Sequence, residues 1–164
     1  MPALTAGTAA PEINLPNTQG KEVSLKEALK RGPVVAAFFK ISCPVCQFAL
    51  PYLERIYKAY SGGKVAIVGI SQDEQNYTEE FAREYRITFP LLLDPVDDYP
   101  ASNAYDLTNV PSIFFIAEGG VKLSIVGWDK RDMERLNAEV ARASGVPLQP
   151  LFGKGEDVPA SKAG

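Results

Sequence analysis

Apolar residues along the chain fall into short continuous runs that alternate with segments of helical periodicity. The run from Val34 to Phe39, which follows Gly32-Pro33, is typical of a strand buried on both faces of a sheet. From Cys46 onward, apolar residues recur at helical spacing, which predicts a helix from about 44 to 60. Val65 to Ile70 is a second predicted buried strand.

The downstream half continues this alternation and ends in a hairpin followed by an amphipathic helix. The hairpin turn is predicted at Glu118-Gly119-Gly120. In chain order, the predicted elements are a helix over Thr78 to Tyr85, an extended piece over Phe89 to Leu93, one helical turn near Ala101 to Tyr105, strands over Ser112 to Ala117 and Val121 to Val126, and a helix over Lys130 to Ala143.

The first residues predict a small hairpin ahead of the first buried strand. Ile13 to Leu15 and Val23 to Leu25 flank Asn17-Thr18-Gln19-Gly20, a sequence suited to a turn between two strands. Ser24 is the predicted N-cap of a short helix from Leu25 to Lys30.

The order of these elements predicts an α/β fold. Strand–helix–strand units imply parallel pairing with right-handed crossovers, and the terminal hairpin adds antiparallel strands. We therefore expect one domain over residues 1–153, with a mixed central β-sheet flanked by helices and an N-terminal hairpin extension. Pro, Gly and Lys accumulate without periodicity after Val146, so residues 154–164 are predicted to form a mobile tail.

The composition of the chain excludes several classes of function. The 164 residues carry a formal net charge of −3 without a dense run of Lys or Arg, which argues against a nucleic-acid partner. Histidine is absent, which excludes nucleophile–His pairs, and two cysteines alone cannot complete a four-ligand zinc site. We therefore expect no metal and no cofactor, and strong chemistry must come from the two thiols or from carboxylates.

No membrane span and no secretory signal are expected from the sequence as written. The longest apolar stretch, Val34 to Phe39, is too short to cross a bilayer. The first eleven residues lack the basic and apolar regions of a signal peptide, which predicts a cytoplasmic protein. A chain trimmed behind its signal would look the same and would be periplasmic or otherwise extracytoplasmic.

Cys43-Pro44-Val45-Cys46 lies where the first buried strand gives way to the predicted helix. Two intervening residues let both sulfurs meet within one turn, so a disulfide can close and reopen. The first sulfur would sit at the helix N-terminus, where unpaired backbone N–H groups favour the nucleophilic thiolate. Pro44 suits the first helical turn because it lacks an N–H. Cys43 is thus the predicted nucleophile and Cys46 the more buried resolving thiol, and their disulfide is the expected redox group.

These features resemble the thioredoxin superfamily, and most closely its redoxin branch, the TlpA/ResA-like thiol-disulfide oxidoreductases and their AhpC/TSA relatives. The likeness covers about residues 10–145. The matching stretches are Ala10 to Pro16 with Gly20 to Leu25, Phe38-Phe39, Cys43 to Cys46, Pro51, Val110-Pro111-Ser112 and Gly127. The resemblance implies a thioredoxin-like fold and thiol–disulfide exchange with protein or small-molecule disulfides, with an unidentified electron donor or acceptor as the second partner.

The resemblance also implies a substrate groove beside the sulfurs. Val110-Pro111, just before a predicted strand, matches the cis-proline loop of the family, and a cis bond would present the Val110 backbone to an incoming chain. Gly127 matches a glycine that lines this groove, and Trp128 would lie there with it. The alternative for Trp128 is a core or surface aromatic that covers the last helix.

Three positions depart from the family pattern. Ser42 replaces the usual aromatic residue before the first cysteine, and Ala37 and Ala49 stand where thioredoxins and ResA-like members carry a carboxylate. The usual proton-moving carboxylate is therefore missing from both places. Lys40, three residues before Cys43, either stabilises the Cys43 thiolate or is a rim lysine screened by water, and we favour the second interpretation.

Two other functions and one inert interpretation stay open. A peroxiredoxin-like peroxidase would direct Cys43 against peroxide, but its pattern requires Pro and Thr/Ser where this chain has Ala36 and Lys40. A non-catalytic thioredoxin-fold binding module is compatible with the missing carboxylates. The two cysteines also fit a pair of structural thiols or an inert disulfide, although their place at a strand-to-helix turn favours a redox pair.

Overall fold

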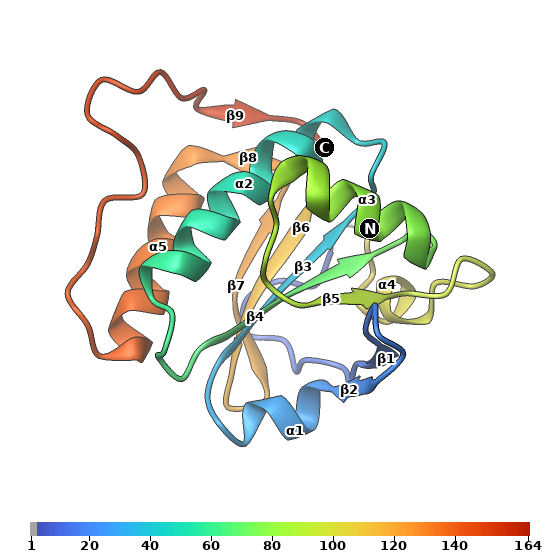
Figure 1. The fold of residues 1–164 in the computed structure, drawn as a ribbon. Coiled ribbons are helices and arrows are strands. Elements are labelled where there is room, and N and C mark those ends of the chain that lie inside the picture. Colours follow the sequence, from blue (N-terminus) through green and yellow to red (C-terminus); the bar gives the residue numbers. More distant parts are fainter. Residues whose placement is uncertain (1–2) are drawn as a thin grey trace.

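A five-stranded sheet lies at the centre of the protein in the computed structural model, which describes residues 3–164 (Figure 1). In spatial order it consists of β5 (Leu91–Leu93), β4 (Ala66–Ser71), β3 (Val34–Phe39), β6 (Ser112–Ala117) and β7 (Gly120–Val126). The β3–β4 and β4–β5 pairs are parallel, whereas the β3–β6 and β6–β7 pairs are antiparallel. The predicted α/β class with a mixed central sheet is therefore confirmed.

β3 forms the middle of the sheet because it carries no polar side chain and is buried along its whole length. Successive side chains of a strand point to opposite faces of the sheet. The odd-numbered residues of β3 accordingly enter one hydrophobic core, and its even-numbered residues enter a second core on the other face.

Helices cover both faces and separate the two cores from solvent. Apolar side chains of α2 (Pro44–Ala59), α3 (Gln75–Tyr85) and α5 (Lys130–Ser144) pack into the first core. The second core receives α1 (Leu25–Leu29), α4 (Pro100–Ala104) and the N-terminal hairpin. The helices and strands predicted from the sequence are all present, with ends that differ by at most three residues.

The predicted N-terminal hairpin is confirmed, and its turn and cap explain why it forms. β1 (Asn14–Pro16) pairs antiparallel with β2 (Glu22–Ser24). Between them, the side-chain oxygen of Asn17 accepts hydrogen bonds from the backbone N–H groups of Gln19 and Lys21, both at 2.9 Å. The hydroxyl of Ser24 then caps α1 by accepting the N–H of Glu27 at 3.2 Å.

Two short strands that the sequence did not predict tie the C-terminal segment to the rest of the protein. β8 (Trp128–Asp129) pairs antiparallel with β9 (Ser161–Lys162). Figure 1 shows the chain leaving α5, running up the outside of the molecule and returning as β9 beside β8 and α2. The structure thus gives residues 154–164 defined contacts, while their mobility stays a prediction.

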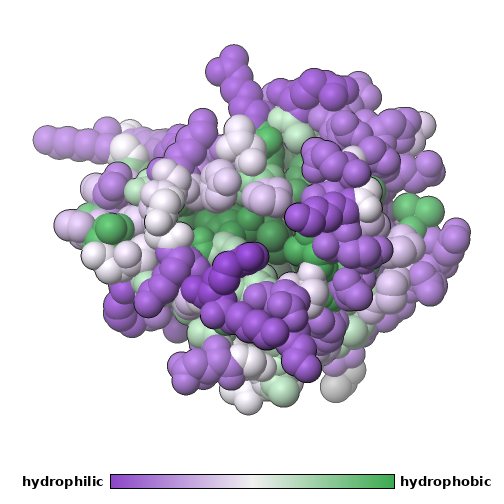
Figure 2. Space-filling model, turned by 60° about the horizontal axis from the view of Figure 1, so that its bottom comes forward, coloured by the Kyte–Doolittle hydropathy of each residue, from purple (hydrophilic) through white to green (hydrophobic). Residues whose placement is uncertain are grey.

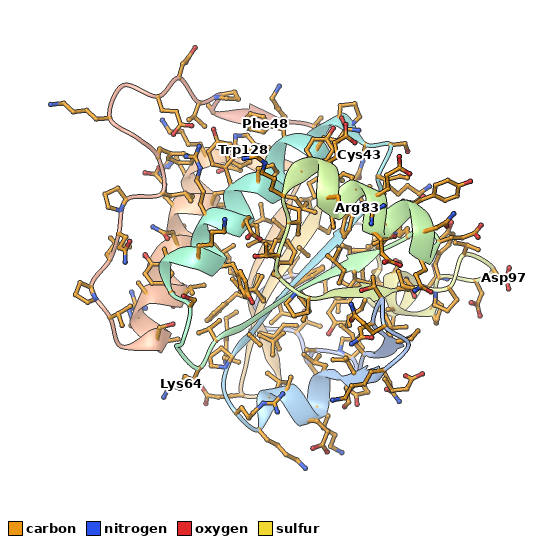
Figure 3. The ribbon with its side chains drawn as sticks, in the orientation of Figure 1. Cys43, Phe48, Lys64, Arg83, Asp97 and Trp128 are labelled. Carbon is orange, nitrogen blue, oxygen red and sulfur yellow. The ribbon has the colours of Figure 1, made fainter. Side chains whose placement is uncertain are left out.

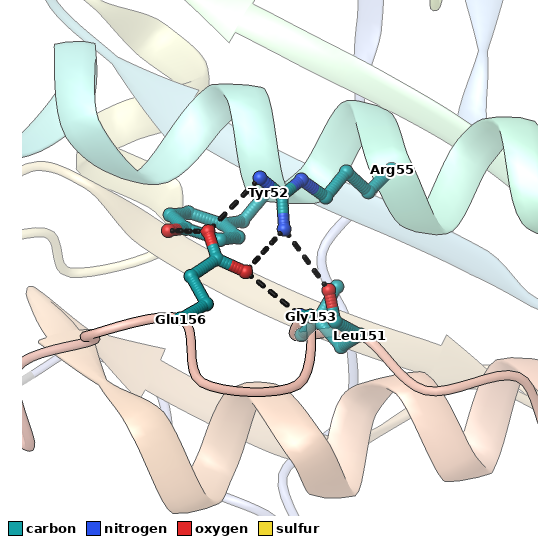
Figure 4. Close-up of polar contacts among 5 residues, drawn as sticks. All are labelled: Tyr52, Arg55, Leu151, Gly153 and Glu156. Carbon is teal, nitrogen blue, oxygen red and sulfur yellow. Dashed lines mark hydrogen bonds and ion pairs between the residues drawn. The ribbon is translucent and has the colours of Figure 1, made fainter.

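Glu156 attaches the middle of this segment to α2 (Figure 4). Its carboxylate accepts hydrogen bonds from both terminal nitrogens of Arg55 at 2.9 and 3.1 Å, from Tyr52 Oη at 2.8 Å and from the N–H of Gly153 at 2.8 Å. These donors, the Arg55 guanidinium first among them, lower the pKa of Glu156 from 4.5 to about 2. The ionised carboxylate is therefore preferred in the folded protein.

Glu156→Gln should destabilise the protein in a pH-dependent way. Because the folded pKa is lowered, the stability that Glu156 contributes is fully present above about pH 4.5 and is lost as the pH falls through about 2. Urea unfolding at pH values from 6 down to about 2 should therefore show wild type and variant converging at the acid end.

Glu139→Gln is the matched control, because Glu139 makes a single exposed ion pair with Arg142 within α5. Exposed pairs of this kind contribute little to stability. A wild-type minus Glu156→Gln difference that is the same at every pH, or no larger than that of the control, would contradict the anchoring role of Glu156.

Candidate active site

Cys43 lies where the chain leaves β3 and enters α2, at one end of the sheet (Figure 3). Its backbone is extended, with φ −86° and ψ 115°, and its side chain occupies the N-cap position of α2. The sulfur accepts a hydrogen bond from the backbone N–H of Cys46 at 3.2 Å. Pro44 takes the first helical position, where no N–H is needed. The predicted placement of the first sulfur at a helix N-terminus is therefore what the structure has.

A carbonyl from the loop before β6 completes the surroundings of this sulfur. The thiol of Cys43 donates to the backbone oxygen of Val110, with 3.5 Å between sulfur and oxygen. The Val110–Pro111 peptide bond is cis, as the resemblance implied. The hydroxyl of Ser112 donates to the carbonyl of Asn109 at 2.8 Å, which holds this loop in place. Two residues 67 positions apart in the sequence thus meet at one sulfur.

The two cysteines, both free thiols, differ sharply in their surroundings. Cys43 is half-buried, whereas Cys46 has an exposed fraction of 0%. Burial raises the pKa of the Cys46 thiol far above its ordinary value, and its hydrogen bond with Cys43 acts in the same direction. Cys46 is therefore protonated at neutral pH in this reduced form. This asymmetry fits the predicted nucleophile and resolving thiol, and the roles themselves stay predictions.

Two polar side chains that the sequence analysis did not select hold the loop between β3 and Cys43. Asp73, just after β4, accepts the backbone N–H of Ile41 at 2.8 Å. Gln47, in the first turn of α2, donates to the carbonyl of Ile41 at 2.9 Å. A usable signal existed for Asp73, because β3 and β4 are parallel and their carboxyl ends meet at the same edge.

Alanine occupies the two positions at which thioredoxins and ResA-like members carry a carboxylate. Ala37 and Ala49 are fully buried in the core beside Cys46. Glu54 is also buried, but it lies further along α2 and accepts hydrogen bonds from Thr88 and from the backbone N–H of Phe89. The negative charge of the Asp73 carboxylate acts on the Cys46 thiol and contributes to its raised pKa.

A shallow hollow of about 430 Å³ opens beside Cys43. Lys40 and Pro44 both line it, so the structure brings the two candidate modulators of the thiol to the same wall as Cys43. Whether either residue changes the reactivity of Cys43 stays a prediction. The remaining lining residues are Gln72, Leu107, Thr108, Asn109, Val110 and Gly164.

Trp128 lies in a buried aromatic cluster and not on an open wall of this hollow. Its exposed fraction is 1%. Its ring packs edge-on against Phe48 at 4.8 Å and in a tilted arrangement against Tyr52 at 5.0 Å, both measured between ring centroids. Figure 3 shows Trp128 and Phe48 side by side near the start of α2. The indole N–H donates to the carbonyl of Pro159 at 2.8 Å, so the C-terminal segment covers this side chain. A direct contact between Trp128 and substrate stays a prediction.

Gly127 also lies beneath the C-terminal segment. Its backbone has φ 74°, a conformation that side chains disfavour. A Cβ atom at this position would lie 2.6 Å from the carbonyl oxygen of Lys162 and 3.0 Å from the nitrogen of Gly164. The glycine therefore permits close approach of an extended chain, and the chain that occupies the place is the protein's own C-terminal segment.

A second hollow, of about 450 Å³, lies at the opposite end of the sheet. Figure 2 shows its apolar floor and polar rim on the face that is turned forward. Val23, Ala28, Tyr57 and Val68 are among its lining residues, and none of the described residues that line it is Cys, His, Asp or Glu. Thiol chemistry therefore belongs to the hollow at Cys43.

Within residues 3–164, no group of three or more His, Cys, Asp or Glu side chains is arranged to hold a metal ion. Over the same residues, no helix combines the length and apolarity needed to cross a bilayer.

Comparison with known proteins finds relatives over most of the chain. The AhpC/TSA family matches residues 6–123. The thiol-disulfide oxidoreductase ResA of Geobacillus kaustophilus (strain HTA426) is 32% identical over 136 residues, which cover 81% of this chain and 76% of the relative.

Solved structures share the architecture. The thioredoxin domain of a thiol-disulfide oxidoreductase from Bacteroides vulgatus superposes with a TM-score of 0.74, 23% identity and coverage of 84% of this chain and 98% of that one. A thiol:disulfide interchange protein from Bacteroides sp. gives a TM-score of 0.73 at 24% identity, covering 88% and 93%. At these identities the likeness shows the fold, which is thioredoxin-like.

The two thiols should differ in reactivity toward iodoacetamide by roughly two orders of magnitude, because only a thiolate that the reagent can reach is alkylated. Cys46 is buried and its pKa is raised, so it reacts only when the structure opens locally. Cys46→Ser reports the rate of Cys43, and Cys43→Ser reports the rate of Cys46. Equal rates, or faster labelling of Cys46, would overturn the assigned asymmetry.

Trp128→Ala should lower the free energy of unfolding by about 3–5 kcal/mol, the usual loss for a large buried aromatic side chain. Urea unfolding measures this loss, and disulfide exchange per folded molecule is measured on the same sample. Trp128→Phe keeps an aromatic ring in the cluster but loses part of the buried ring volume and the N–H that donates to the Pro159 carbonyl, so it should cost less than Trp128→Ala. A small stability loss combined with a large loss of exchange rate would show that Trp128 acts on substrate instead.

Proposed function

Because this chain belongs to the AhpC/TSA family, we propose that Cys43 and Cys46 perform thiol–disulfide exchange as attacking and resolving thiols. The chain is a thiol-disulfide oxidoreductase with a thioredoxin-like fold. One observation carries the division of roles. The half-buried sulfur of Cys43 caps α2 and accepts a backbone N–H, while Cys46, one turn further, is fully buried.

The reaction begins with the Cys43 thiolate. It attacks one sulfur of a substrate disulfide, the substrate S–S bond breaks, and the other substrate sulfur leaves as a thiolate that takes up a proton. The backbone N–H of Cys46 donates to the Cys43 sulfur, an acceptor role that a thiolate fills better than a thiol. The product of this step is a mixed disulfide between Cys43 and the substrate.

Cys46 then completes the exchange. Its thiol loses a proton and attacks the Cys43 sulfur, which releases the second substrate thiol and leaves a Cys43–Cys46 disulfide. The substrate disulfide gains two electrons and two protons, and the protein dithiol loses the same number. The reverse sequence makes the protein an oxidant. Burial supports the order of the steps, because Cys46 reaches a sulfur only from inside the fold.

Two partner classes follow from this cycle. One is a polypeptide or small molecule that contains a disulfide. The other is a dithiol or disulfide carrier that returns the Cys43–Cys46 pair to its starting state. The carbonyl of Val110, 3.5 Å from the Cys43 sulfur, is a backbone acceptor for an extended substrate chain.

No feature of the site favours peroxide as the substrate. Ala36 is fully buried in the core on the other face of β3, and Lys40 stands on the wall of the hollow. Neither supplies the hydroxyl that the peroxidase pattern places three residues before its cysteine. Slow peroxide consumption beside fast disulfide reduction is therefore the expected ranking.

Cys46→Ser should trap a mixed disulfide through Cys43, because the attacking step remains and the resolving step is removed. Incubation of the reduced variant with oxidised insulin, followed by non-reducing electrophoresis and mass spectrometry, should show one covalent adduct at Cys43. Cys43→Ser is the matched control and should give none. An adduct at Cys46 in the control, or no adduct with any disulfide in either variant, would contradict the mechanism.

A further inference from the structure

The last six residues of the C-terminal segment, 159–164, lie across the active-site end of the protein, and we call them the strap. The strap adds a strand to β8, with Lys162 opposite Trp128 and Ser161 opposite Asp129. Just before this pairing, the N–H of Lys130 donates to the carbonyl of Ala160 at 2.9 Å. These are backbone contacts of the kind by which an extended peptide joins a sheet edge.

The strap reaches the same carbonyl that the nucleophile touches. Gly164 lines the hollow of Cys43, and its carbonyl accepts a hydrogen bond from the side chain of Asn109 at 3.0 Å. A Cβ atom on Gly164 would lie 2.3 Å from the carbonyl oxygen of Val110. The backbone of the strap is therefore pressed against Val110, the residue whose oxygen lies 3.5 Å from the Cys43 sulfur.

We propose that the strap is an intramolecular competitor for substrate and sets which disulfides reach Cys43. An extended polypeptide that needs the edge of β8 and the Val110 backbone finds them occupied, whereas a small disulfide enters the open hollow. The strap thereby selects substrates by size and by affinity. This inference rests on the proposed exchange reaction at Cys43.

The strap is built to lift while the chain before it stays attached. Leu151 and Val158 are buried, and Glu156 is held by Arg55 and Tyr52. The carbonyl of Pro159 accepts the indole N–H of Trp128, so the segment is anchored up to Pro159 and the strap lifts from Ala160 onward. Residues 160–164 are exposed, and their side chains are small apart from that of Lys162. A segment with few buried contacts opens at low free-energy cost.

Tethering decides how strongly the strap competes. A short flexible tether holds its segment near the site at an effective concentration on the order of millimolar. The ammonium of Lys162 lies 5.3 Å from the ring centroid of Phe48, a contact that adds to the backbone hydrogen bonds. A polypeptide must therefore bind well enough to displace the strap, and weakly bound chains are excluded.

Gly164→Leu tests the strap in the full chain. A side chain at this position collides with the Val110 carbonyl, so this end of the strap must move away from Val110, and the substitution lies outside both hydrophobic cores. Ala163→Leu is the matched control, because it adds the same side chain at a neighbouring exposed residue. Lys162→Pro is a second displacing variant, because it removes a backbone N–H from β9.

The readouts are reduction rates of insulin and of 2-hydroxyethyl disulfide. Displacing the strap should raise the insulin rate by roughly 5- to 10-fold in both variants. Lys162→Pro, which changes no residue lining the hollow, should leave the small-disulfide rate within about 2-fold, and the control should match wild type on both. A displacing variant that matches the control on insulin, or that accelerates both substrates equally, would overturn the strap as a selector.

A measurement of how accessible Cys43 is to reagents of different size requires no disulfide exchange, so it tests the strap separately from the proposed function. In the Cys46→Ser background, Cys43 is labelled with a large reagent, a polyethylene glycol maleimide, and with a small one, N-ethylmaleimide. The ratio of the large-reagent rate to the small-reagent rate reports access to Cys43. Gly164→Leu should raise this ratio and Ala163→Leu should not; an unchanged ratio counts against the strap. Absence of disulfide reduction in all variants would instead defeat the proposed function, and with it the strap as a substrate selector.

Discussion

The hydrogen bond from the backbone N–H of Cys46 to the sulfur of Cys43 is the contact around which this end of the protein is arranged. It requires Cys43 to be the N-cap of α2, a short loop beyond a strand whose burial on both faces fixes its position. Asp73 and Gln47 hold the connecting loop through the backbone of Ile41. Val110 lies just before β6, the strand next to β3, and its carbonyl oxygen is 3.5 Å from the Cys43 sulfur.

The pattern of apolar residues predicted the fold well, because buried strands appear as continuous apolar runs and helices as apolar residues at helical spacing. The apolar run of β3 and the spacing after Cys46 located the strand and helix that position the site. β8 and β9 were missed because each is two residues long and forms only by pairing with a partner about 30 residues away. The location of Trp128, in the groove or in the core, was ambiguous because the segment that buries it lies about 30 residues away and has no periodic pattern.

Of the site, the sequence supplied the thiols and the loop that faces them, but not the groups that hold the loop. The position of Asp73 depends on the parallel pairing of two strands, which a scan along the chain does not include. With Ala37 and Ala49 in place of carboxylates, Cys46 lies in an apolar core, where burial raises the pKa of its thiol. The proposed strap acts at the other thiol, because it restricts which substrates reach Cys43.

The central claim is that Cys43 and Cys46 act as one two-electron redox pair. A redox titration in glutathione buffers, quenched with acid and read by mass spectrometry, tests it directly. The account predicts that both thiols disappear together, with a slope of about 30 mV per tenfold change in equilibrium and a midpoint between about −270 and −120 mV, the range spanned by thioredoxin and DsbA. Accumulation of protein carrying glutathione on Cys43 with Cys46 still reduced, or two independent one-thiol transitions, would contradict it.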